Sequence, residues 1–135
     1  MSTRAVGELL QGKDDQVYTV SPDASVQEAL ELMVAKGISS LPVTLGGTLV
    51  GIVSERDYIR KAVPRRIVPW EVRVQEIMTR EVICVTRNDT IRDCMERMTS
   101  NRIRHLPVVE GGILIGMLSI SDIVRALRPA RIDFS

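Results

Sequence analysis

The chain has 135 residues, of which 44% are hydrophobic and 26% are charged, a composition typical of one compact soluble domain. Its 18 basic side chains against 17 acidic ones leave a formal charge of +1, which excludes a strong overall field toward nucleic acid or an anionic membrane. Residues 1–15 lack the apolar run of a signal peptide, and no stretch approaches the roughly 18 apolar residues that span a bilayer, so we expect a cytoplasmic protein without a membrane segment.

The first predicted elements are a short lead-in helix over residues 6–10 and a short strand over residues 17–20. Residues 25–28 have the spacing of a capping box, and apolar residues follow at helical intervals. We therefore predict a helix that begins after Ser25 and ends at Gly37.

The next elements are two strands and a second helix. Residues 41–44 are predicted to be extended, because Pro42 lacks an amide donor and restricts the residue before it. The double glycine at residues 46–47 turns the chain into a buried strand at residues 49–53. Ser54 then begins a second helix, whose predicted inner side carries Ile59, Ala62 and Val63.

The second half of the chain repeats the first. With an offset of 65 residues, residues 17–60 align with residues 82–125 without a gap, and 15 of the 44 pairs are identical, where chance gives about three. Each repeat is predicted to be β-α-β-β-α, and the two should pack as a pseudo-twofold pair, because neither is large enough to bury its own apolar face. The fold class is therefore α/β (α+β).

The repeats set the domain boundaries. Residues 74–78 resemble residues 6–10 at an offset of 68, so each repeat has its own lead-in helix, and the three-residue difference falls in the polar loop at residues 12–16. We assign repeat 1 to residues 1–65, the linker to residues 66–73 and repeat 2 to residues 74–135. In the linker region, Trp70 is interpreted as a packing anchor, and the basic cluster of Arg60, Lys61, Arg65 and Arg66 as a solvated surface.

The most specific motif is Ser54-Glu55-Arg56-Asp57, which is echoed by residues 119–122. At a helix start, unpaired amides and the helix dipole suit a phosphate, and a carboxylate can accept hydrogen bonds from two vicinal ribose hydroxyls. Arg56 in the first repeat and Ser121 in the second would point toward the anion. The spacing is also that of a helix cap, and a duplicated cap would recur equally, so the motif by itself favours capping.

These residues resemble a tandem of cystathionine-β-synthase (CBS) domains, the pair called a Bateman module. The resemblance rests on the segments VYTVSPDASVQEAL, GISSLPV and NRIRHLPV, the double-glycine turns, and the endings GIVSERD and GMLSISD, and it covers about nine tenths of the chain. More narrowly, the chain resembles the stand-alone bacterial modules of this superfamily. The resemblance implies an adenine nucleotide (AMP, ATP or NAD(H)) in the cleft between the repeats, a homodimer, and an unidentified regulated protein as partner.

The resemblance also implies composite sites, with the aspartate from one repeat and the base-contacting segment from the other. The first cleft would then be formed by Ser54, Arg56, Asp57, Ile83, Cys84, Arg102, Ile103, Arg104, His105 and Pro107. The second would be formed by Tyr18, Thr19, Ile38, Ser39, Ser40, Pro42, Ser119, Ser121 and Asp122. Arg102 and Arg104 are predicted to share one face of an extended stretch. With Arg56 and His105 they would gather in the first cleft, whereas the second has no basic side chain in its motif, so the first is expected to bind a charged phosphate better.

Other classes of function have less support. The chain has one histidine, and Cys84 and Cys94 match no zinc or redox spacing, so we predict no enzyme, no metal and no catalytic cofactor, and interpret both cysteines as buried hydrophobes. Arginine makes up 15 of the 18 basic residues, but the balanced charge argues against nucleic-acid binding. The alternative function is a ligand-free dimeric scaffold for a partner protein, in which the two Ser-x-x-Asp motifs are only caps.

Overall fold

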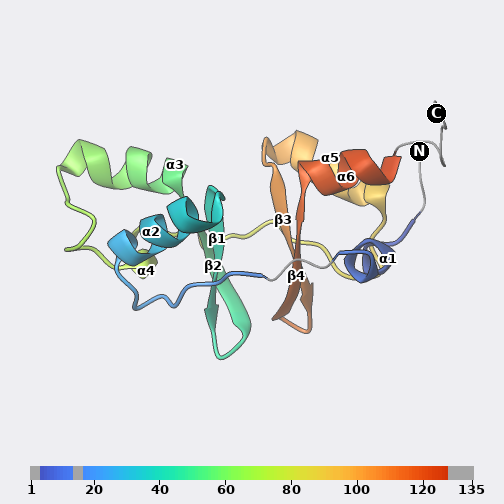
Figure 1. The fold of residues 1–135 in the computed structure, drawn as a ribbon, viewed down its shortest axis with the longest axis horizontal. Helices are drawn as coiled ribbons and strands as arrows, with labels where there is room; N and C mark the ends of the chain where they lie inside the picture. The colour runs from blue at the N-terminus through green and yellow to red at the C-terminus, as the bar shows by residue number, and fades with distance from the viewer. Residues whose placement is uncertain (1–3, 14–16, 128–135) are drawn as a thin grey trace. The chain divides into compact units, whose positions relative to one another are not determined.

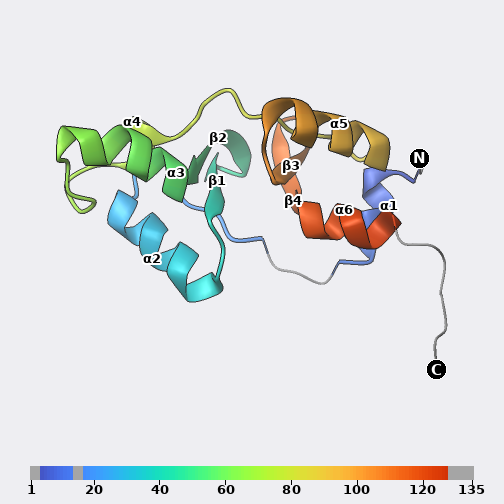
Figure 2. The same cartoon turned by 90° about the horizontal axis from the view of Figure 1, so that it is seen from above.

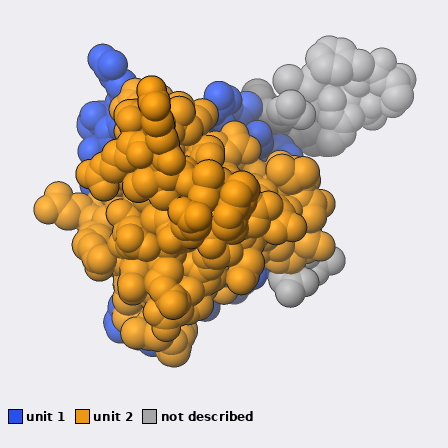
Figure 3. Space-filling model, turned by 90° about the vertical axis from the view of Figure 1, so that its left-hand side faces the viewer, with its two compact units in different colours: residues 1–17, 83–135 blue, residues 18–82 orange. Residues whose placement is uncertain are grey.

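The computed structural model describes residues 4–13 and 17–127, so part of the predicted polar loop, residues 14–16, lies outside the described residues. The chain divides into two compact units, which Figure 3 colours separately. Unit 1 consists of residues 1–17 and 83–135, and unit 2 of residues 18–82. No helix in the described ranges is long and apolar enough to cross a membrane.

Unit 2 is built on the hairpin of β1 (Ser40–Leu45) and β2 (Thr48–Ser54), whose strands pair antiparallel. Its helix α2 (Val26–Lys36) begins where the Ser25 side chain accepts a hydrogen bond from the Glu28 amide, and it ends at Gly37, whose φ of 66° is left-handed. After β2 come α3 (Glu55–Asp57), a π-helical stretch η1 (Tyr58–Ala62) and a 3-10 turn η2 (Val63–Arg65), and the unit closes with α4 (Val74–Ile77). Within the unit the helices lie together on one face of the hairpin (Figures 1 and 2).

Unit 1 repeats this plan around the antiparallel hairpin of β3 (His105–Glu110) and β4 (Ile113–Ser119). Its helices are α1 (Val6–Gln11), α5 (Ile91–Asn101) and α6 (Ile120–Leu127), and they too lie on one face of their hairpin (Figures 1 and 2). A complete capping box at Thr90 and Asp93 begins α5, at the place that Ser25 and Glu28 occupy in the first repeat. Two hairpins, each covered by helices, confirm the mixed α/β fold of a CBS pair module.

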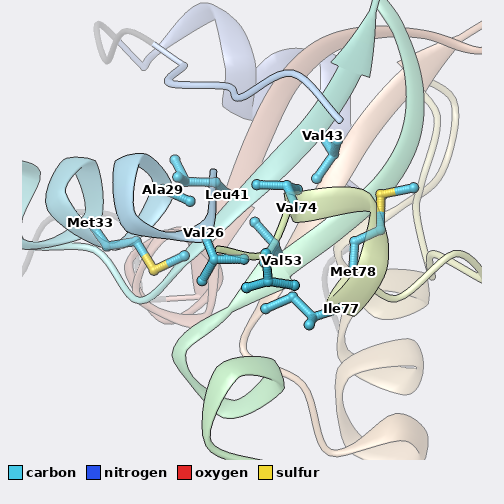
Figure 4. Close-up of a cluster of buried hydrophobic side chains, with 10 residues drawn as sticks. Val26, Ala29, Met33, Leu41, Val43, Val53, Val74, Ile77 and Met78 are labelled. Atoms are coloured by element: carbon cyan, nitrogen blue, oxygen red, sulfur yellow. The ribbon is translucent and has the colours of Figure 1, made fainter. Parts of the chain in front are cut away.

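Each unit has its own apolar core. In unit 2, side chains from α2, β1, β2, α4 and the residues that flank α4 meet in one cluster (Figure 4), made up of Val26, Ala29, Met33, Leu41, Val43, Val53, Val72, Val74, Ile77 and Met78. In unit 1 the corresponding cluster is made up of Val6, Val85, Ile91, Cys94, Met98, Leu106, Val108, Leu118 and Ile123. Because aromatic residues are scarce, aliphatic side chains and methionines supply both cores.

Each lead-in helix packs in the unit of the other repeat and not in the unit of the repeat that it precedes. Helix α1, which precedes repeat 1, belongs to unit 1, where the Val6 amide donates to the Asp89 carbonyl at 2.8 Å. Helix α4, which precedes repeat 2, belongs to unit 2, where the Val74 amide donates to the Ala24 carbonyl at 2.8 Å. Each compact unit therefore combines one repeat with the lead-in helix of the other.

A side chain from each lead-in segment packs against a glycine of a strand. A Cβ at Gly51 would lie 2.6 Å from Met78 Sδ, and a Cβ at Gly116 would lie 2.7 Å from Leu10 Cδ2. The two glycines are equivalent in the repeat, and so are Met78 and Leu10 in the lead-in segments. Close approach of a side chain to the strand backbone therefore requires glycine at both positions.

Several local predictions were wrong. The strand predicted at residues 17–20 is only one isolated bridge, from Val20 to Val43. Ile59 and Val63, predicted on the inner side of the second helix, are 59% and 50% exposed, whereas Ala62 is buried as predicted. Trp70 is 66% exposed and is therefore no packing anchor.

The prediction for Arg102 was also wrong. Its φ of 53° places it in the left-handed region, where it ends α5 at the position that Gly37 occupies after α2. It therefore does not alternate with Arg104 along an extended stretch. Of the two cysteines, Cys94 is buried as predicted, whereas Cys84 is only half-buried.

Candidate ligand-binding site

The first candidate site is the Asp57 cluster, which we define as Asp57, Ser54, Lys61 and Thr79 of unit 2. Asp57 is a buried polar residue with 8% of its surface exposed. Its Oδ2 accepts from the Ser54 amide at 2.9 Å and from Ser54 Oγ at 3.0 Å, which completes the capping box. Its Oδ1 accepts from Thr79 Oγ1 at 3.0 Å and forms an ion pair with Lys61 Nζ at 3.0 Å.

The second is the Asp122 cluster of unit 1, which we define as Asp122, Ser119, Lys13 and Arg125. Asp122 is 9% exposed, and its Oδ2 accepts from the Ser119 amide at 2.8 Å, from Ser119 Oγ at 3.1 Å and from Lys13 Nζ at 2.8 Å. Its Oδ1 accepts from Arg125 at 2.9 Å. Both Ser-x-x-Asp motifs therefore have the geometry of the helix cap that the sequence predicted as one of their two interpretations.

The two clusters obtain a lysine from unrelated positions. Lys61 lies one turn after Asp57 on its own helix, whereas Lys13 comes from the segment after α1 and is 109 residues from Asp122. Each ammonium also donates to a backbone carbonyl, Lys61 to Ile77 at 2.8 Å and Lys13 to Met117 at 2.6 Å. In both units the lysine therefore ties a lead-in segment to the aspartate or to its neighbouring strand.

Thr79 and Lys13 perform corresponding tasks. In unit 2 the Thr79 amide donates to the Ile52 carbonyl at 2.8 Å, while the Thr79 hydroxyl donates to Asp57. In unit 1 the Lys13 ammonium donates both to the carbonyl of Met117, which is the repeat equivalent of Ile52, and to Asp122. In unit 1 the Lys13 ammonium thus makes the two contacts that the amide and the hydroxyl of Thr79 make in unit 2.

The charges around Asp122 keep it ionised. Burial alone would raise the pKa of the Asp122 carboxyl, but the hydrogen bond from Lys13 and those from Ser119 outweigh it, so the pKa lies below its ordinary value. His105, which pairs with Ser119 across the hairpin, has a lowered pKa because it is buried and because Arg104 and Lys13 are positively charged. The Asp122 carboxylate is therefore an anionic acceptor, and His105 is harder to protonate in the folded chain.

The helix-start amides are less available for a phosphate than the sequence suggests. The Glu55 amide donates to the Ser39 carbonyl at 3.1 Å, and the Asp57 amide donates to Ser54 Oγ at 3.1 Å. In unit 1 the Ile120 amide donates to the Arg104 carbonyl at 2.8 Å. These amides already have partners within their own unit, because the segment before each hairpin ends beside the helix start.

The residues predicted for the two clefts are divided between the units. Unit 2 holds Tyr18, Thr19, Ile38, Ser39, Ser40, Pro42, Ser54, Arg56 and Asp57. Unit 1 holds Ile83, Cys84, Arg102, Ile103, Arg104, His105, Pro107, Ser119, Ser121 and Asp122. The composite clefts stay a prediction from the resemblance.

Within unit 2, two predicted segments do come together. Strand pairing sets Ser40 opposite Ser54, so Ser39 and Ser40 lie beside the start of α3. The Ser40 hydroxyl is buried and has no hydrogen-bond partner among the described residues. Pro42 and Pro107 are buried in their strands, whereas Arg56 and Arg104 are exposed.

Sequence reasoning missed Thr79, Lys13 and Arg125, and it interpreted Lys61 as part of a solvated cluster. Arg125 carried a signal, because Arg60 stands at the same place in the first repeat. Thr79 and Lys13 carried none, since their contacts to the aspartates depend on how the lead-in segments pack.

Comparison with known proteins points to one family. The model of the family described as CBS domain matches residues 6–63 and residues 74–129. A solved structure of a protein with CBS domains from Burkholderia ambifaria MC40-6 is 41% identical, with a TM-score of 0.85, and the match covers 97% of this chain and 99% of that one.

Two further solved structures contain adenosine compounds. CBSX2 in complex with AMP is 31% identical, with a TM-score of 0.74, over 90% of this chain and 94% of that one. The CBS domain pair of protein MJ0100, in complex with 5′-methylthioadenosine and S-adenosyl-L-methionine, is 26% identical, with a TM-score of 0.77, over 93% of this chain and 96% of that one.

Among curated proteins, the CBS domain-containing protein CBSX3, mitochondrial, of Arabidopsis thaliana is 39% identical over 110 residues, which are 78% of this chain and 53% of that protein. The inosine-5′-monophosphate dehydrogenase of Thermoplasma acidophilum is 35% identical over 111 residues, which are 80% of this chain and 21% of the enzyme. The chain thus spans about half of the first relative and a fifth of the second.

Proposed function

Because the chain belongs to the CBS domain family, we propose that it is a regulatory module that binds an adenine nucleotide of the AMP, ATP or NAD(H) type and senses the nucleotide or energy state. It carries out no catalysis of its own in this proposal. The observation that carries it is the pair of buried aspartates, Asp57 and Asp122, at equivalent positions of the two units.

The chemistry of the two clusters supports this function. A buried, ionised carboxylate is an acceptor for the two vicinal hydroxyls of a ribose. The orphan hydroxyl of Ser40 beside Ser54 would gain a hydrogen-bond partner from a ligand. Relatives of the same fold bind AMP, 5′-methylthioadenosine and S-adenosyl-L-methionine, and all three carry an adenosine group.

The test separates ligand binding from helix capping. We would measure the affinity for AMP, ATP, NAD and S-adenosyl-L-methionine by titration calorimetry for the unmodified chain, Asp57→Ala, Asp122→Ala and the control Asp93→Ala. Asp93 forms a capping box of the same geometry with Thr90 and belongs to neither aspartate cluster, so its variant loses a cap without touching the proposed ribose acceptors. All three variants should lose about 1 kcal/mol of stability through the cap.

Only the variants at Asp57 and Asp122 should lose affinity, each by about ten- to a hundredfold at its own cluster, because two hydrogen bonds to the ribose disappear. Unchanged affinity in both variants would refute the assignment of the ribose acceptors. Failure of every adenosine compound to bind the unmodified chain would refute the proposed function.

A second function is a dimeric scaffold for a partner protein. It is favoured by Ile59 and Val124, which occupy equivalent positions in the two repeats and are 59% and 52% exposed. Apolar side chains repeated on the outer side of two equivalent helices are suited to an interface between copies. A homodimer is compatible with both functions, and ligand binding distinguishes them.

A further inference from the structure

The two aspartates differ in what must move before a ribose can bind. A carboxylate has about four acceptor positions, two on each oxygen. Asp57 receives four donors: the Ser54 amide, Ser54 Oγ, Thr79 Oγ1 and Lys61 Nζ. Asp122 also receives four: the Ser119 amide, Ser119 Oγ, Lys13 Nζ and Arg125. Among the described residues, Asp57 therefore has two donors on each oxygen, whereas Asp122 has three donors on Oδ2 and one on Oδ1.

At Asp122 a ribose has to displace one donor. The capping donors and Lys13 all use Oδ2, so within the part of the chain that the structure describes Oδ1 accepts from Arg125 alone. The Arg125 side chain is 65% exposed, and an exposed ion pair contributes little stability. If Arg125 moves away, both acceptor positions of Oδ1 become available, and Lys13 keeps its contacts.

At Asp57 the replacement disturbs a lead-in segment. Oδ1 is held by the Thr79 hydroxyl and by Lys61, and Lys61 also binds the Ile77 carbonyl of α4. The other oxygen, Oδ2, is held by Ser54 through its amide and its hydroxyl, and Ser54 caps the helix. The donors that can leave are thus Lys61, which also binds the backbone of α4, and Thr79, which lies two residues after α4.

We propose that Thr79, together with Lys61, gates the Asp57 cluster, so that an adenosine ribose binds Asp57 only by releasing the contacts of the α4 segment, whereas it binds Asp122 with the lead-in segment still in place. This inference rests on the proposed function. It makes Asp122 the tighter cluster, which is the reverse of the order expected from the arginines of the sequence. It makes Asp57 the cluster at which ligand binding loosens the α4 segment.

Thr79 is a positioning residue in this scheme, and its hydroxyl can be removed with little other change. Thr79→Val keeps the shape of the side chain and the backbone pairing with Ile52, in which the Thr79 amide donates at 2.8 Å. Thr86→Val is the matched control, because the Thr86 hydroxyl also donates to a carboxylate, that of Asp89, at 3.3 Å. Thr79→Ser retains the hydroxyl.

The experiment measures AMP affinity by calorimetry in an Asp122→Asn background, which leaves Asp57 as the ribose acceptor. Thr79→Val should tighten AMP binding by about tenfold, since one donor to a charged group no longer has to be displaced. Thr79→Ser and Thr86→Val should leave the affinity unchanged. Unchanged or weaker binding with Thr79→Val would overturn the gate.

Two further readouts test the rest of the proposal. The unmodified chain should show two AMP affinities, and Asp57→Asn, in which Asp122 is intact, should retain the tighter one; loss of the tighter one would overturn the order. Saturating AMP should speed amide hydrogen exchange at residues 77–79 and leave residues 8–11 of α1 unchanged, and equal exchange in the two segments would overturn the coupling. If AMP and adenosine both fail to bind the unmodified chain, the proposed function itself fails.

Discussion

Replacing Gly51 by alanine tests whether the lead-in segment packs directly on the strand. The added Cβ would lie 2.6 Å from Met78 Sδ, 3.0 Å from Met78 Cγ and 3.1 Å from the Thr79 carbonyl oxygen. Met78 is 6% exposed and belongs to the core. Both the amide and the carbonyl of Thr79 are hydrogen-bonded to the Ile52 backbone, so neither neighbour can move freely. We expect the α4 segment to be pushed off the strand.

The magnitude follows from these contacts. Inserting a methyl group into a packed core costs about 1–3 kcal/mol, and alanine in place of a strand glycine returns about 0.5 kcal/mol of chain entropy. Gly51→Ala should therefore lower the free energy of unfolding by about 0.5–2.5 kcal/mol, and the Tm by about 2–9 °C for a chain of this length. At Gly116 the neighbours are the end atoms of the half-buried Leu10, which can rotate, so Gly116→Ala should cost less than about 1 kcal/mol.

The assay is thermal unfolding followed by circular dichroism, with urea unfolding as a second measurement. Gly7→Ala in α1 is the control, since its Cβ would lie 3.6 Å from the Arg87 carbonyl oxygen, an ordinary contact, and alanine favours a helix. It should be neutral or stabilising by up to about 1 kcal/mol.

A double variant identifies the cause. In a Met78→Ala background, Gly51→Ala should lose most of its cost, because the sulfur atom that it meets is gone. The reasoning would be refuted if Gly51→Ala were as stable as the unmodified chain, or if its cost were the same with and without the Met78 side chain.

Two further predictions concern assembly and pH. Light scattering should give twice the chain mass of 15.0 kDa. Ile59→Glu should yield monomers, whereas the control Val34→Glu, at a residue of α2 that is 79% exposed, should not. A mass of 15.0 kDa for the unmodified chain over a wide concentration range would contradict the homodimer. The pKa of His105 is lowered in the folded protein by burial, Arg104 and Lys13, against the opposite effect of Asp122, so the unfolded chain binds the proton more readily and stability should fall as the pH decreases through about 6.5. Thermal unfolding between about pH 5 and 7.5 should show a weaker dependence in His105→Gln, and an unchanged dependence would contradict this assignment.

Much of the fold followed from local patterns. The helix from Val26 to Lys36 was predicted within its bounds, because a serine cap, an apolar stripe and a terminal glycine act over one or two turns of chain. The hairpins were predicted for the same reason, since the double glycines supply the positive φ angles of the turns, 58° and 85° at Gly46 and Gly47. The repeat predicted that both units would share this plan.

Predictions failed where a residue's surroundings decided its conformation. The left-handed Arg102 is a non-glycine residue in a glycine position, and Trp70 is exposed despite its size. Ile59 and Val63 were placed on the inner side of the helix after Asp57, but both are exposed. Val124, the equivalent of Ile59, is exposed as well although it lies in the regular helix α6, so helical spacing alone does not tell which side packs.

The sequence by itself determined that the chain is a tandem of two CBS repeats and that Asp57 and Asp122 are its chemically distinctive residues. Only the tertiary structure decided what holds each carboxylate. Lys13 reaches Asp122 across 109 residues of chain, and Thr79 reaches Asp57 across 22, because each lead-in segment packs on the repeat that does not follow it directly. Contacts of that kind depend on the close packing of a glycine against a side chain from a distant segment, and local sequence patterns do not encode which distant segment that will be.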